Sequence, residues 1–397
     1  MSKAVHGVAR LVFFCVLLLS AAYIAGSCGG GQQQQSENQQ VEDVSDSVPV
    51  SKHALRAAEI ADSMDIKLLA AQLILSAIPG KETVLDSIHQ FLTVIPVGGI
   101  TLFGYNLVPD PEKNRVFVEE LFNYMSGITL PPFIASDQEG GTVQRIRGDA
   151  ALPAPLTYWE RLQTEEGVAA DTVIAAVERE AAQAGRELRR IGVTLNLAPL
   201  AEALTENNRP FLKTRAYGPC PIFITNAAAA FIRGMEEAGI ASTIKHFPGN
   251  SGVDPHYHTA ILNVSDAELE EKVGPFRELI RREAPAAVMV SHVIVPSWDT
   301  LPLTRSSVAV ERIRDMGFTG IIMADCFSMV ATGAPPEVAV VEALAAGIDM
   351  VMTWPNTIQE TYKAILGALE AGILSEERVR DAAKRIIYQK LRYELME

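Results

Sequence analysis

The sequence predicts an α/β fold: a single (β/α)8 barrel of the TIM type, with one further helix packed on its outside. From about residue 60 onward, short apolar runs rich in β-branched residues alternate with longer amphipathic runs. The short runs number eight, as one such barrel requires. A doubly wound open sheet has the same alternation, which periodicity cannot exclude, but the count of eight favours the barrel.

Each predicted strand is a short segment dominated by apolar residues, as expected for parallel strands buried on both faces. The eight strands are expected at 72–77, 98–103, 132–137, 193–199, 242–247, 287–292, 320–325 and 348–354. Amphipathic periodicity predicts helices that include 111–127, 172–192 and 338–347, and a final helix at 375–396.

Polar residues stand at the ends of several of these strands. Asp137 ends the third predicted strand, Lys245 and His246 end the fifth, His292 the sixth and Asp325 the seventh. In a (β/α)8 barrel the carboxyl ends of all strands converge on one mouth. Five polar residues that each close an apolar run therefore predict the lining of a pocket at this mouth.

The N-terminus has the features of a targeting segment. Lys3 and Arg10 precede the apolar run "LVFFCVLLLSAAYIA", which ends in the small residues and cysteine of "AGSC". This arrangement resembles a bacterial lipoprotein signal, with a signal peptide at 1–27 and Cys28 as the lipidated residue; ordinary cleavage with Cys28 as a bystander is the alternative. The polar, low-complexity stretch that follows predicts a disordered tether at 28–60, before a catalytic domain at 61–397.

Charge and cysteine content exclude several classes of protein. The formal net charge is −14 and no basic stretch is conspicuous, which argues against nucleic acid or an anionic membrane surface as the main partner. Cys220 and Cys326 are the only cysteines of the body of the chain, and neither belongs to a CxxC motif. Both are expected to be structural.

The segment "KHFPGNSGVDPHYH", residues 245–258, contains three of the seven histidines. It is a metal site, an acid–base site or a polar loop without a role. The spacing of the histidines matches no common zinc pattern. In "DPH", the spacing of Asp254 and His256 lets the carboxylate orient the imidazole and favour its charged form, which suits general acid–base catalysis.

The other strand-end residues allow both a functional and an ordinary interpretation. Asp325 is either an N-cap for the next helix or a carboxylate held rigidly as a glycosidase nucleophile. Asp137 and Arg145 are either surface charges or donors and acceptors for sugar hydroxyls. The pair Gly140–Gly141 permits a tight turn between them. Lys245 should not be buried without a polar partner.

Taken together, these segments resemble glycoside hydrolase family 3. The resemblance rests on "KHFPG" followed by Asp-x-His, on "DQEGG" and "QR" upstream, and on the strand end before "SM" downstream. Further stretches that match are "GGITLFGYN", "GRELRRIGVTLNLAP", "RAYG" and "ALAAGIDMVM". The similarity covers residues 65–395 and is closest to the β-N-acetylglucosaminidase branch, which includes enzymes of peptidoglycan recycling.

The resemblance implies a retaining exo-β-N-acetylglucosaminidase without metal or cofactor. It implies that Asp325 is the nucleophile, His256 the acid–base and Asp254 the partner of that histidine. The residues that hold the non-reducing sugar would be Asp137, Arg145, Arg215, Lys245 and His246.

The chain departs from the family pattern at a few positions. Asn250–Ser251 replaces the usual histidine-glycine after "KHFPG", and the loop before Asp254 is about two residues shorter. Cys326 follows the nucleophile, and Thr214 precedes Arg215, where aspartate is common in both places. A sugar-binding lipoprotein without catalysis therefore remains an alternative, as does a β-glucosidase of the same family.

The remaining expectations concern partners and location. The partner is a β-linked N-acetylglucosaminide from peptidoglycan fragments or chitooligosaccharides, and the chain is expected to be a monomer that binds no nucleic acid. Its only membrane contact would be the lipid on Cys28, which would hold it in the bacterial cell envelope.

Overall fold

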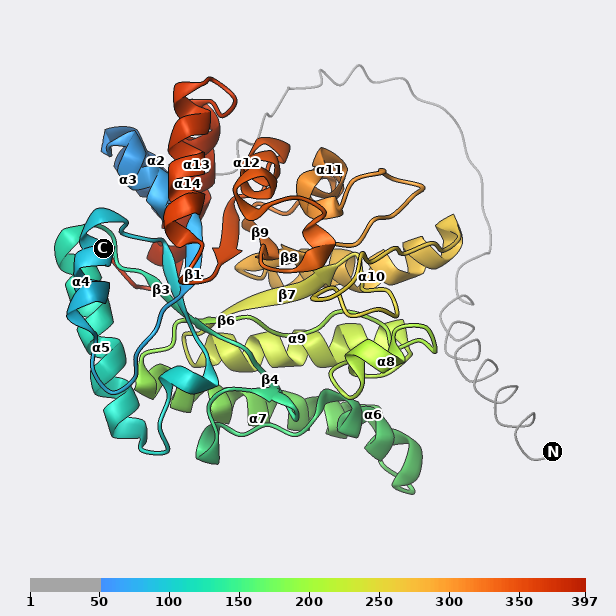
Figure 1. Ribbon diagram of the computed structural model, residues 1–397. Coiled ribbons are helices and arrows are strands. Elements are labelled where there is room, and N and C mark those ends of the chain that lie inside the picture. Colours follow the sequence, from blue (N-terminus) through green and yellow to red (C-terminus); the bar gives the residue numbers. More distant parts are fainter. Residues whose placement is uncertain (1–50) are drawn as a thin grey trace, which may run out of the picture. The chain divides into compact units, whose positions relative to one another are not determined.

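The computed structural model describes residues 51–397, and it contains the closed barrel that the sequence predicts (Figure 1). Neighbouring strands are parallel and follow one another around the ring in chain order, until the last strand pairs with the first. Closure excludes the open doubly wound sheet. The barrel strands are β1 (Ile74–Ala77), β2 (Gly99–Leu102), β3 (Phe133–Ser136), β6 (Leu195–Asn196), β7 (Ala241–Phe247), β8 (Ala287–Val290), β9 (Ile321–Cys326) and β10 (Met350–Thr353).

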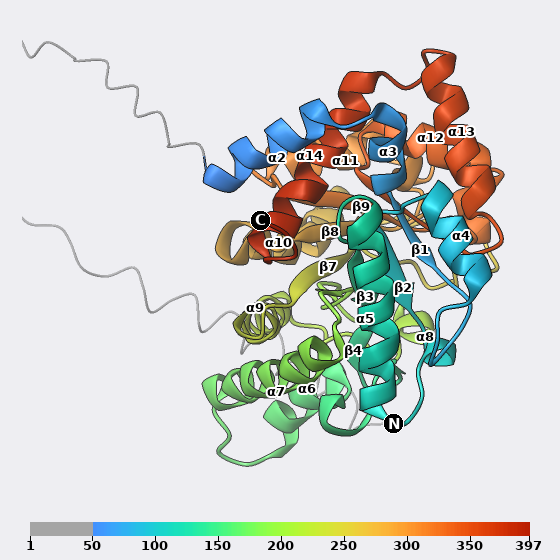
Figure 2. The ribbon, with the colours of Figure 1, turned by 90° about the vertical axis from the view of Figure 1, so that its left-hand side faces the viewer.

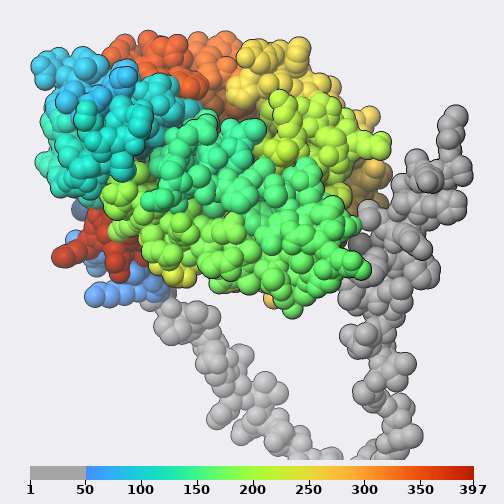
Figure 3. Space-filling model, turned by 90° about the horizontal axis from the view of Figure 1, so that it is seen from below, coloured from blue at the N-terminus to red at the C-terminus, as the bar shows by residue number. Residues whose placement is uncertain are grey.

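Helices on the outside of the barrel connect successive strands, and the last of them, α13, follows β10. They are α4 (Asp86–Val94), α5 (Pro111–Ile128), α7 (Ala170–Ile191), α9 (Pro221–Glu237), α10 (Asp266–Glu283), α11 (Ser307–Asp315), α12 (Pro336–Ala346) and α13 (Ile358–Glu370). Figure 3 shows the face on which the segment that contains α7 (green) forms a broad part of the surface.

Smaller elements precede, interrupt or follow this alternation. They are α2 (Lys52–Ser63), α3 (Ile66–Gln72), η1 (Gly104–Asn106), the hairpin of β4 (Gln138–Gly140) and β5 (Val143–Gln144), η2 (Gly148–Ala150), α6 (Pro155–Thr164), α8 (Arg209–Leu212), η3 (Leu303–Arg305), η4 (Val330–Thr332) and α14 (Glu376–Arg392).

Local sequence signals explain where the helices begin. The carboxylate of Asp110 accepts a hydrogen bond from the backbone of Glu112, and proline occupies the first position of α5. Before α10, Ser265 and Glu268 form a reciprocal capping box. These caps satisfy N–H groups that have no partner inside the helix.

Glycine is required where the chain enters β2. A Cβ atom built on Gly98 would lie 1.9 Å from the carbonyl oxygen of Gln72. Only a residue without a side chain therefore lets the two segments approach this closely.

The strand register shows what fills the barrel below its mouth. Lys245 pairs with Met289, which pairs with Met323, which in turn pairs with Met350. Paired residues of neighbouring strands point to the same face of a sheet. Three buried methionine side chains therefore lie on the same face of the barrel sheet as Lys245.

The opposite end of the barrel is closed by ionic contacts. Asp349, fully buried before β10, accepts hydrogen bonds or ion pairs from three arginines. Two of these arginines come from α14, which packs against α2 and α3 (Figure 2). The prediction that the final helix packs outside the barrel is confirmed.

The structure corrects the end of the predicted tether. Residue 60 was expected to lie in a disordered segment, but Lys52–Ser63 form α2, where Ala57 and Ala61 are buried. Its apolar residues have helical spacing, and Ile60 and Met64 also pack on the core. The helix was missed because it directly follows the polar stretch and was assigned to the tether. The predicted signal peptide and Cys28 lie outside the described residues. From Ser51 to Glu397, the structure has no helix with the length and apolar character that a bilayer crossing needs.

Candidate active site

Charged residues from separate strands meet at the C-terminal mouth of the barrel. The ammonium group of Lys245 donates to Asp137 Oδ1 at 2.9 Å, although the two residues are 108 positions apart. His246 Nε2 lies 3.9 Å from Asp325 Oδ2. The structure therefore brings together four of the five strand-end residues that the sequence predicts for the mouth.

Asp137 is held from two sides. Its second carboxylate oxygen accepts a hydrogen bond from Arg145 Nη2 at 2.9 Å. Burial opposes ionisation of this carboxyl group, but the charges of Lys245 and Arg145 outweigh the effect and hold its pKa below the ordinary range. Asp137 therefore stays an anion at neutral pH.

The turn after Asp137 explains how Arg145 returns to it. Gly140, the last residue of β4, and Gly141 both have positive φ, and the turn they form joins β4 to β5 in an antiparallel hairpin. The buried side-chain oxygen of Gln138 accepts hydrogen bonds from the backbone of Arg145 and Ile146. The tight turn predicted for the two glycines is confirmed.

A second carboxylate, Glu139, lies in the same cluster and was not predicted. It accepts two hydrogen bonds of 2.8 Å from the guanidinium of Arg215, and its Oε1 lies 2.7 Å from Lys245 Nζ. Burial acts against its charge, yet the pKa is lowered because Lys245 and Arg215 lie beside it. Arg215 thus joins the cluster through Glu139.

Lys245 is the centre of this cluster. Its side chain is 2% exposed, and burial alone would lower its pKa. The charges of Asp137 and Glu139 more than compensate, so the pKa is raised and the ammonium stays charged. The need for a polar partner, inferred from the sequence, is met by two carboxylates.

His246 is positioned by a third carboxylate that the sequence analysis missed. Its Nδ1 lies 2.7 Å from Oε1 of Glu202. The carboxylate of Glu202 also accepts hydrogen bonds from the backbone of Asn250, at Oε2, and from its side chain, at Oε1. Burial opposes the charge of Glu202, but these bonds and the charge of His246 lower its pKa. Nε2 of His246 is left to face Asp325.

Asp325 sits near the end of β9 with a partly accessible carboxylate. The backbone N–H of Cys326 donates to its Oδ1 at 2.7 Å. Burial raises the pKa of the Cys326 thiol to about 11, so the group beside Asp325 is neutral. No positively charged side chain lies within ion-pairing distance of Asp325 among residues 51–397, apart from His246 when it is protonated.

His292 does not join the charged cluster. It is buried with Nδ1 at 2.7 Å from the Thr304 hydroxyl and Nε2 at 3.0 Å from the carbonyl oxygen of Cys326. Burial lowers its pKa, which outweighs the opposite effect of Asp325. The neutral ring therefore supports the backbone just after Asp325.

The loop after β7, residues 248–265, carries Asp254 and His256 and is called the flap below. Their side chains are 42% and 53% exposed, and His256 Nδ1 lies 2.7 Å from Asp254 Oδ1. Desolvation opposes ionisation of Asp254, but hydrogen bonds from the backbone and ring of His256 lower its pKa. The pairing expected from the "DPH" spacing is confirmed.

The flap is attached to the loop that follows Asp325. The backbone N–H of Val330 donates to the carbonyl oxygen of His256 at 3.4 Å, and that of Ala331 donates to Pro255 at 3.1 Å. No hydrogen bond or ion pair joins the side chains of His256 and Asp325 within residues 51–397. The two segments are connected through their backbones.

The histidines of this region occupy different surroundings. His246 is buried in the mouth with Glu202, whereas His256 is half exposed on the flap with Asp254. In the described part of the chain, no three His, Cys, Asp or Glu side chains are grouped so that they could hold a metal ion.

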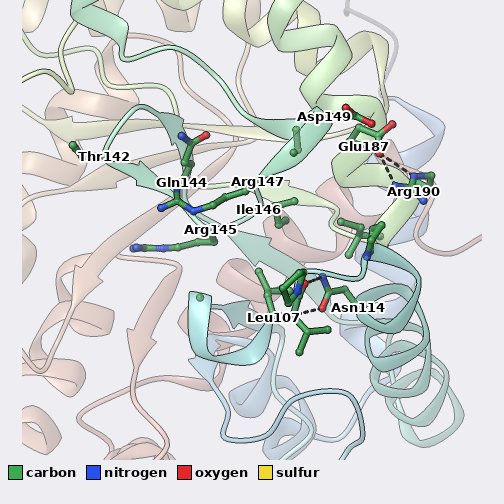
Figure 4. A pocket seen from close by; sticks show the side chains of 17 residues that line it. Leu107, Asn114, Thr142, Gln144, Arg145, Ile146, Arg147, Asp149, Glu187 and Arg190 are labelled. Atoms are coloured by element: carbon green, nitrogen blue, oxygen red, sulfur yellow. Dashed lines mark hydrogen bonds and ion pairs between the residues drawn. The ribbon is translucent and has the colours of Figure 1, made fainter.

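Aromatic rings and a cavity lie on the other side of Arg145. Its guanidinium covers the ring of Phe103 at 5.2 Å, and Phe103 stacks on Trp354 at 4.8 Å. Arg145 also lines a cavity of about 680 Å³, which lies between the β4–β5 hairpin, the start of α5 and the end of α7. Figure 4 shows Gln144 on one side of this cavity and Asn114 on the other.

Comparison with known proteins identifies the family. The model of the glycosyl hydrolase family 3 N-terminal domain matches residues 66–388. The chain belongs to glycosyl hydrolase family 3. A β-hexosaminidase of Methylococcus capsulatus is 34% identical over 291 residues, which are 71% of this chain and 82% of that protein. The assignment to this family, expected from the sequence, is confirmed.

Two further similarities extend the comparison. β-Hexosaminidase A of Pseudoalteromonas piscicida is 25% identical over 340 residues, 77% of this chain and 55% of that protein. The structure of a family 3 β-N-acetylglucosaminidase from a Paenibacillus species has a TM-score of 0.76 and 28% identity, with 84% of this chain and 63% of that one covered. The chain thus spans little more than half of the first of these relatives.

Proposed function

We propose that the protein is a retaining exo-β-N-acetylglucosaminidase that releases terminal N-acetylglucosamine from peptidoglycan fragments or chitooligosaccharides. The observation that carries this proposal is the placement of Asp325 beside the charged cluster. The Asp254–His256 pair lies on the flap, which is joined by backbone hydrogen bonds to the loop that follows Asp325. The family supports it, since relatives are named β-hexosaminidase and β-N-acetylglucosaminidase.

In the first step, a carboxylate oxygen of Asp325 attacks the anomeric carbon. The bond to the leaving oxygen breaks, and Nε2–H of His256 gives that oxygen its proton, so the leaving group departs as an alcohol. The product of this step is a covalent glycosyl-aspartate. Asp254 holds Nδ1 of the ring and stabilises the charged form that donates the proton.

In the second step, neutral His256 takes a proton from a water molecule, whose oxygen attacks the same carbon. The bond to Asp325 breaks, N-acetylglucosamine leaves, and both side chains return to their first state. Two displacements at one carbon retain its configuration.

The charged cluster supplies the contacts that hold the sugar. Sugar hydroxyls both donate and accept hydrogen bonds, and Asp137, Lys245 and Arg145 offer both kinds of group in fixed positions. Arg215 and His246 act at the edges of this site through Glu139 and Glu202. Their carboxylate partners fix the geometry before substrate arrives, which favours catalysis.

Two rival functions use the same residues. A family 3 β-glucosidase would cleave the β-glucoside in preference to the N-acetyl substrate. A sugar-binding protein without catalysis would bind the sugar and release nothing. Intact Asp325 and the formed Asp254–His256 pair favour the enzyme over the binding protein.

The test compares nitrophenyl N-acetyl-β-glucosaminide with nitrophenyl β-glucoside, using the full chain. We expect cleavage of the first and little of the second. His256→Ala should then keep far more of the rate of the glycosylation step on the nitrophenyl substrate than on a disaccharide, because an acidic leaving group needs little protonation. Equal losses on both, or loss of activity with a chelator, would contradict the role of His256.

The cellular location is a separate proposal, which rests on the sequence of residues 1–50. Lipidation of Cys28 would hold the enzyme in the bacterial cell envelope, on a long polar segment. Cys28→Ser is expected to move the protein from the membrane fraction to the soluble fraction without changing its activity. A variant that stays in the membrane fraction would contradict the lipid anchor.

A further inference from the structure

The flap begins with a mostly buried segment, residues 248–252, which is called the root below. Asn250 and Ser251 are 4% and 3% exposed, whereas Tyr257, near the middle of the flap, is 73% exposed. Asn250–Ser251 is also the pair at which the chain departs from the family pattern. A buried amide side chain needs hydrogen-bond partners, so the partners of Asn250 show what the root is attached to.

Asn250 donates hydrogen bonds to both carboxylate oxygens of Glu202. Its backbone N–H bonds to Oε2 at 2.6 Å, and its side-chain Nδ2 bonds to Oε1 at 3.0 Å. The same Oε1 lies 2.7 Å from Nδ1 of His246 and accepts the backbone N–H of His246 at 3.2 Å. The side chain of Glu202 is 1% exposed. Because hydrogen bonds to a buried charged group are strong, Glu202 ties the root to His246.

Further contacts hold the root between two neighbouring loops. A Cβ atom built on Gly252 would lie 2.3 Å from the carbonyl oxygen of Asn207, on the loop that also carries Glu202. From the loop after β8, the hydroxyl of Ser291 lies 3.4 Å from the carbonyl oxygen of Gly249. The root is therefore fixed by the loops that follow β6 and β8.

The root limits where His256 can lie. Asp254 follows Asn250 by four positions, and a chain of this length spans at most about 14 Å. Asp254 in turn holds Nδ1 of His256 at 2.7 Å, which leaves Nε2 to reach the leaving oxygen. Acid catalysis needs the proton donor within hydrogen-bonding distance of that oxygen, and a misplacement of about 1 Å can cost about 100-fold in rate. The position of the root therefore affects the acid–base step.

We propose that Asn250 is a positioning residue for the acid–base step. Through Glu202 it keeps the root at a fixed place beside His246, whose Nε2 lies 3.9 Å from Asp325 Oδ2. One buried carboxylate thus orients both a group next to the nucleophile and the segment that leads to the acid. The proposal rests on the proposed function and extends it to Asn250, which takes no part in the two chemical steps.

The test compares two substrates whose leaving groups need different degrees of protonation. Nitrophenyl N-acetyl-β-glucosaminide has an acidic leaving group that needs little, whereas the leaving sugar of N,N′-diacetylchitobiose needs a full proton. Asn250→Ala removes the bond from Nδ2 to Glu202, which should displace His256 and lower kcat/KM for the disaccharide about 10-fold. The kcat/KM for the nitrophenyl substrate should stay within about threefold of the wild-type value.

Two further variants separate positioning from a purely structural role. In the His256→Ala background, Asn250→Ala should change kcat/KM for the disaccharide by no more than about twofold, since a residue that acts through His256 has nothing left to position. Gly252→Ala pushes the root away from Asn207 and should show the same selective loss as Asn250→Ala. It also carries the test if Asn250→Ala does not fold.

Asn114→Ala is the matched control. Asn114 is another buried asparagine, 5% exposed, but its amide bonds to the backbone of Val108 at the start of α5. The folded fraction of this variant should hydrolyse both substrates at the wild-type rate.

Three results would overturn the proposal: equal losses on both substrates in the two root variants, no loss on either, or a full 10-fold further loss when Asn250→Ala is added to His256→Ala. Hydrolysis of neither substrate by the wild-type chain would overturn the proposed function as well, so the two failures are distinguishable.

Discussion

Both ends of the barrel bury ionic side chains, but the two ends differ in what they leave free. At the mouth, Lys245 lies between Asp137 and Glu139, and the carboxylate of Asp325 remains partly accessible beside them. At the base, Asp349 is fully buried and its oxygens are occupied by three arginines and a backbone N–H. Asp325 at the mouth therefore keeps an accessible carboxylate, whereas the carboxylate of Asp349 at the base is enclosed by its partners.

The difference indicates that the buried ion pairs at the base stabilise the fold, whereas the accessible carboxylate at the mouth takes part in the reaction. Breaking a buried ion pair is costly because the remaining charge loses its partner. The network at the base joins α11, α14 and the start of β10, so its loss should lower the stability of the fold without affecting the reacting groups. Asp325 has no such structural partner, so its loss should affect the reaction without unfolding the protein.

The largest effect is expected at the mouth. Asp325→Asn keeps the size of the side chain and removes the anion that attacks the sugar, so kcat should fall by several orders of magnitude. The melting temperature should change little. Steady-state rates and thermal unfolding on the same preparation measure both. A variant that retains a tenth of the wild-type rate would show that another carboxylate is the nucleophile.

A smaller but still large effect is expected at the base, and it concerns stability. Asp349→Asn leaves the arginines without their shared anion and should lower the free energy of unfolding by about 3–5 kcal/mol. The kcat of the folded fraction should be unchanged. Asp381→Asn is the matched control, because Asp381 pairs with two of the same arginines but is half exposed, and such pairs contribute about 0–1 kcal/mol. Equal losses in urea unfolding would contradict the importance of burial.

A third effect, smaller per pH unit, is a pH dependence at the base. Lys390 is fully buried, with Gln72 Oε1 at 2.7 Å and no carboxylate partner among residues 51–397, and burial lowers its pKa to about 7. From about pH 7 to 10 the unfolded chain binds a proton that the folded chain does not, so its contribution to the free energy of unfolding rises with pH, by at most about 1.4 kcal/mol per unit. Lys390→Met should lose this slope. Lys384→Met, on the exposed side of α14, should keep it, and equal slopes in the two variants would place the titration elsewhere.

The sequence predicts the barrel well because buried parallel strands are apolar along their whole length. All eight predicted strands correspond to strands of the closed barrel. The start of the folded domain was placed too late, because α2 directly follows the polar stretch and was assigned to the tether, although its apolar residues have helical spacing.

The candidate site was predicted in part. Strand ends indicated the residues that meet at the mouth, because the fold brings all carboxyl ends of the strands together. Glu139 and Glu202 were missed because their partners are 76 and 44 positions away, and no local spacing connects them. A signal was present in each case: Glu139 lies inside the quoted "DQEGG", and Glu202 follows the apolar "NLAPLA". A carboxylate next to a buried strand end requires a partner.

The most direct test of the account is to trap the covalent intermediate. A 5-fluoro N-acetylglucosaminyl fluoride has a good leaving group and forms glycosyl-enzymes that hydrolyse slowly, so the adduct should accumulate. Peptide mass spectrometry after proteolysis locates it. The account predicts a sugar adduct on Asp325 in the wild-type chain and none in Asp325→Asn. An adduct on Asp137, Glu139 or any other carboxylate, or turnover of the reagent without an adduct, would contradict the assignment of Asp325 as the nucleophile.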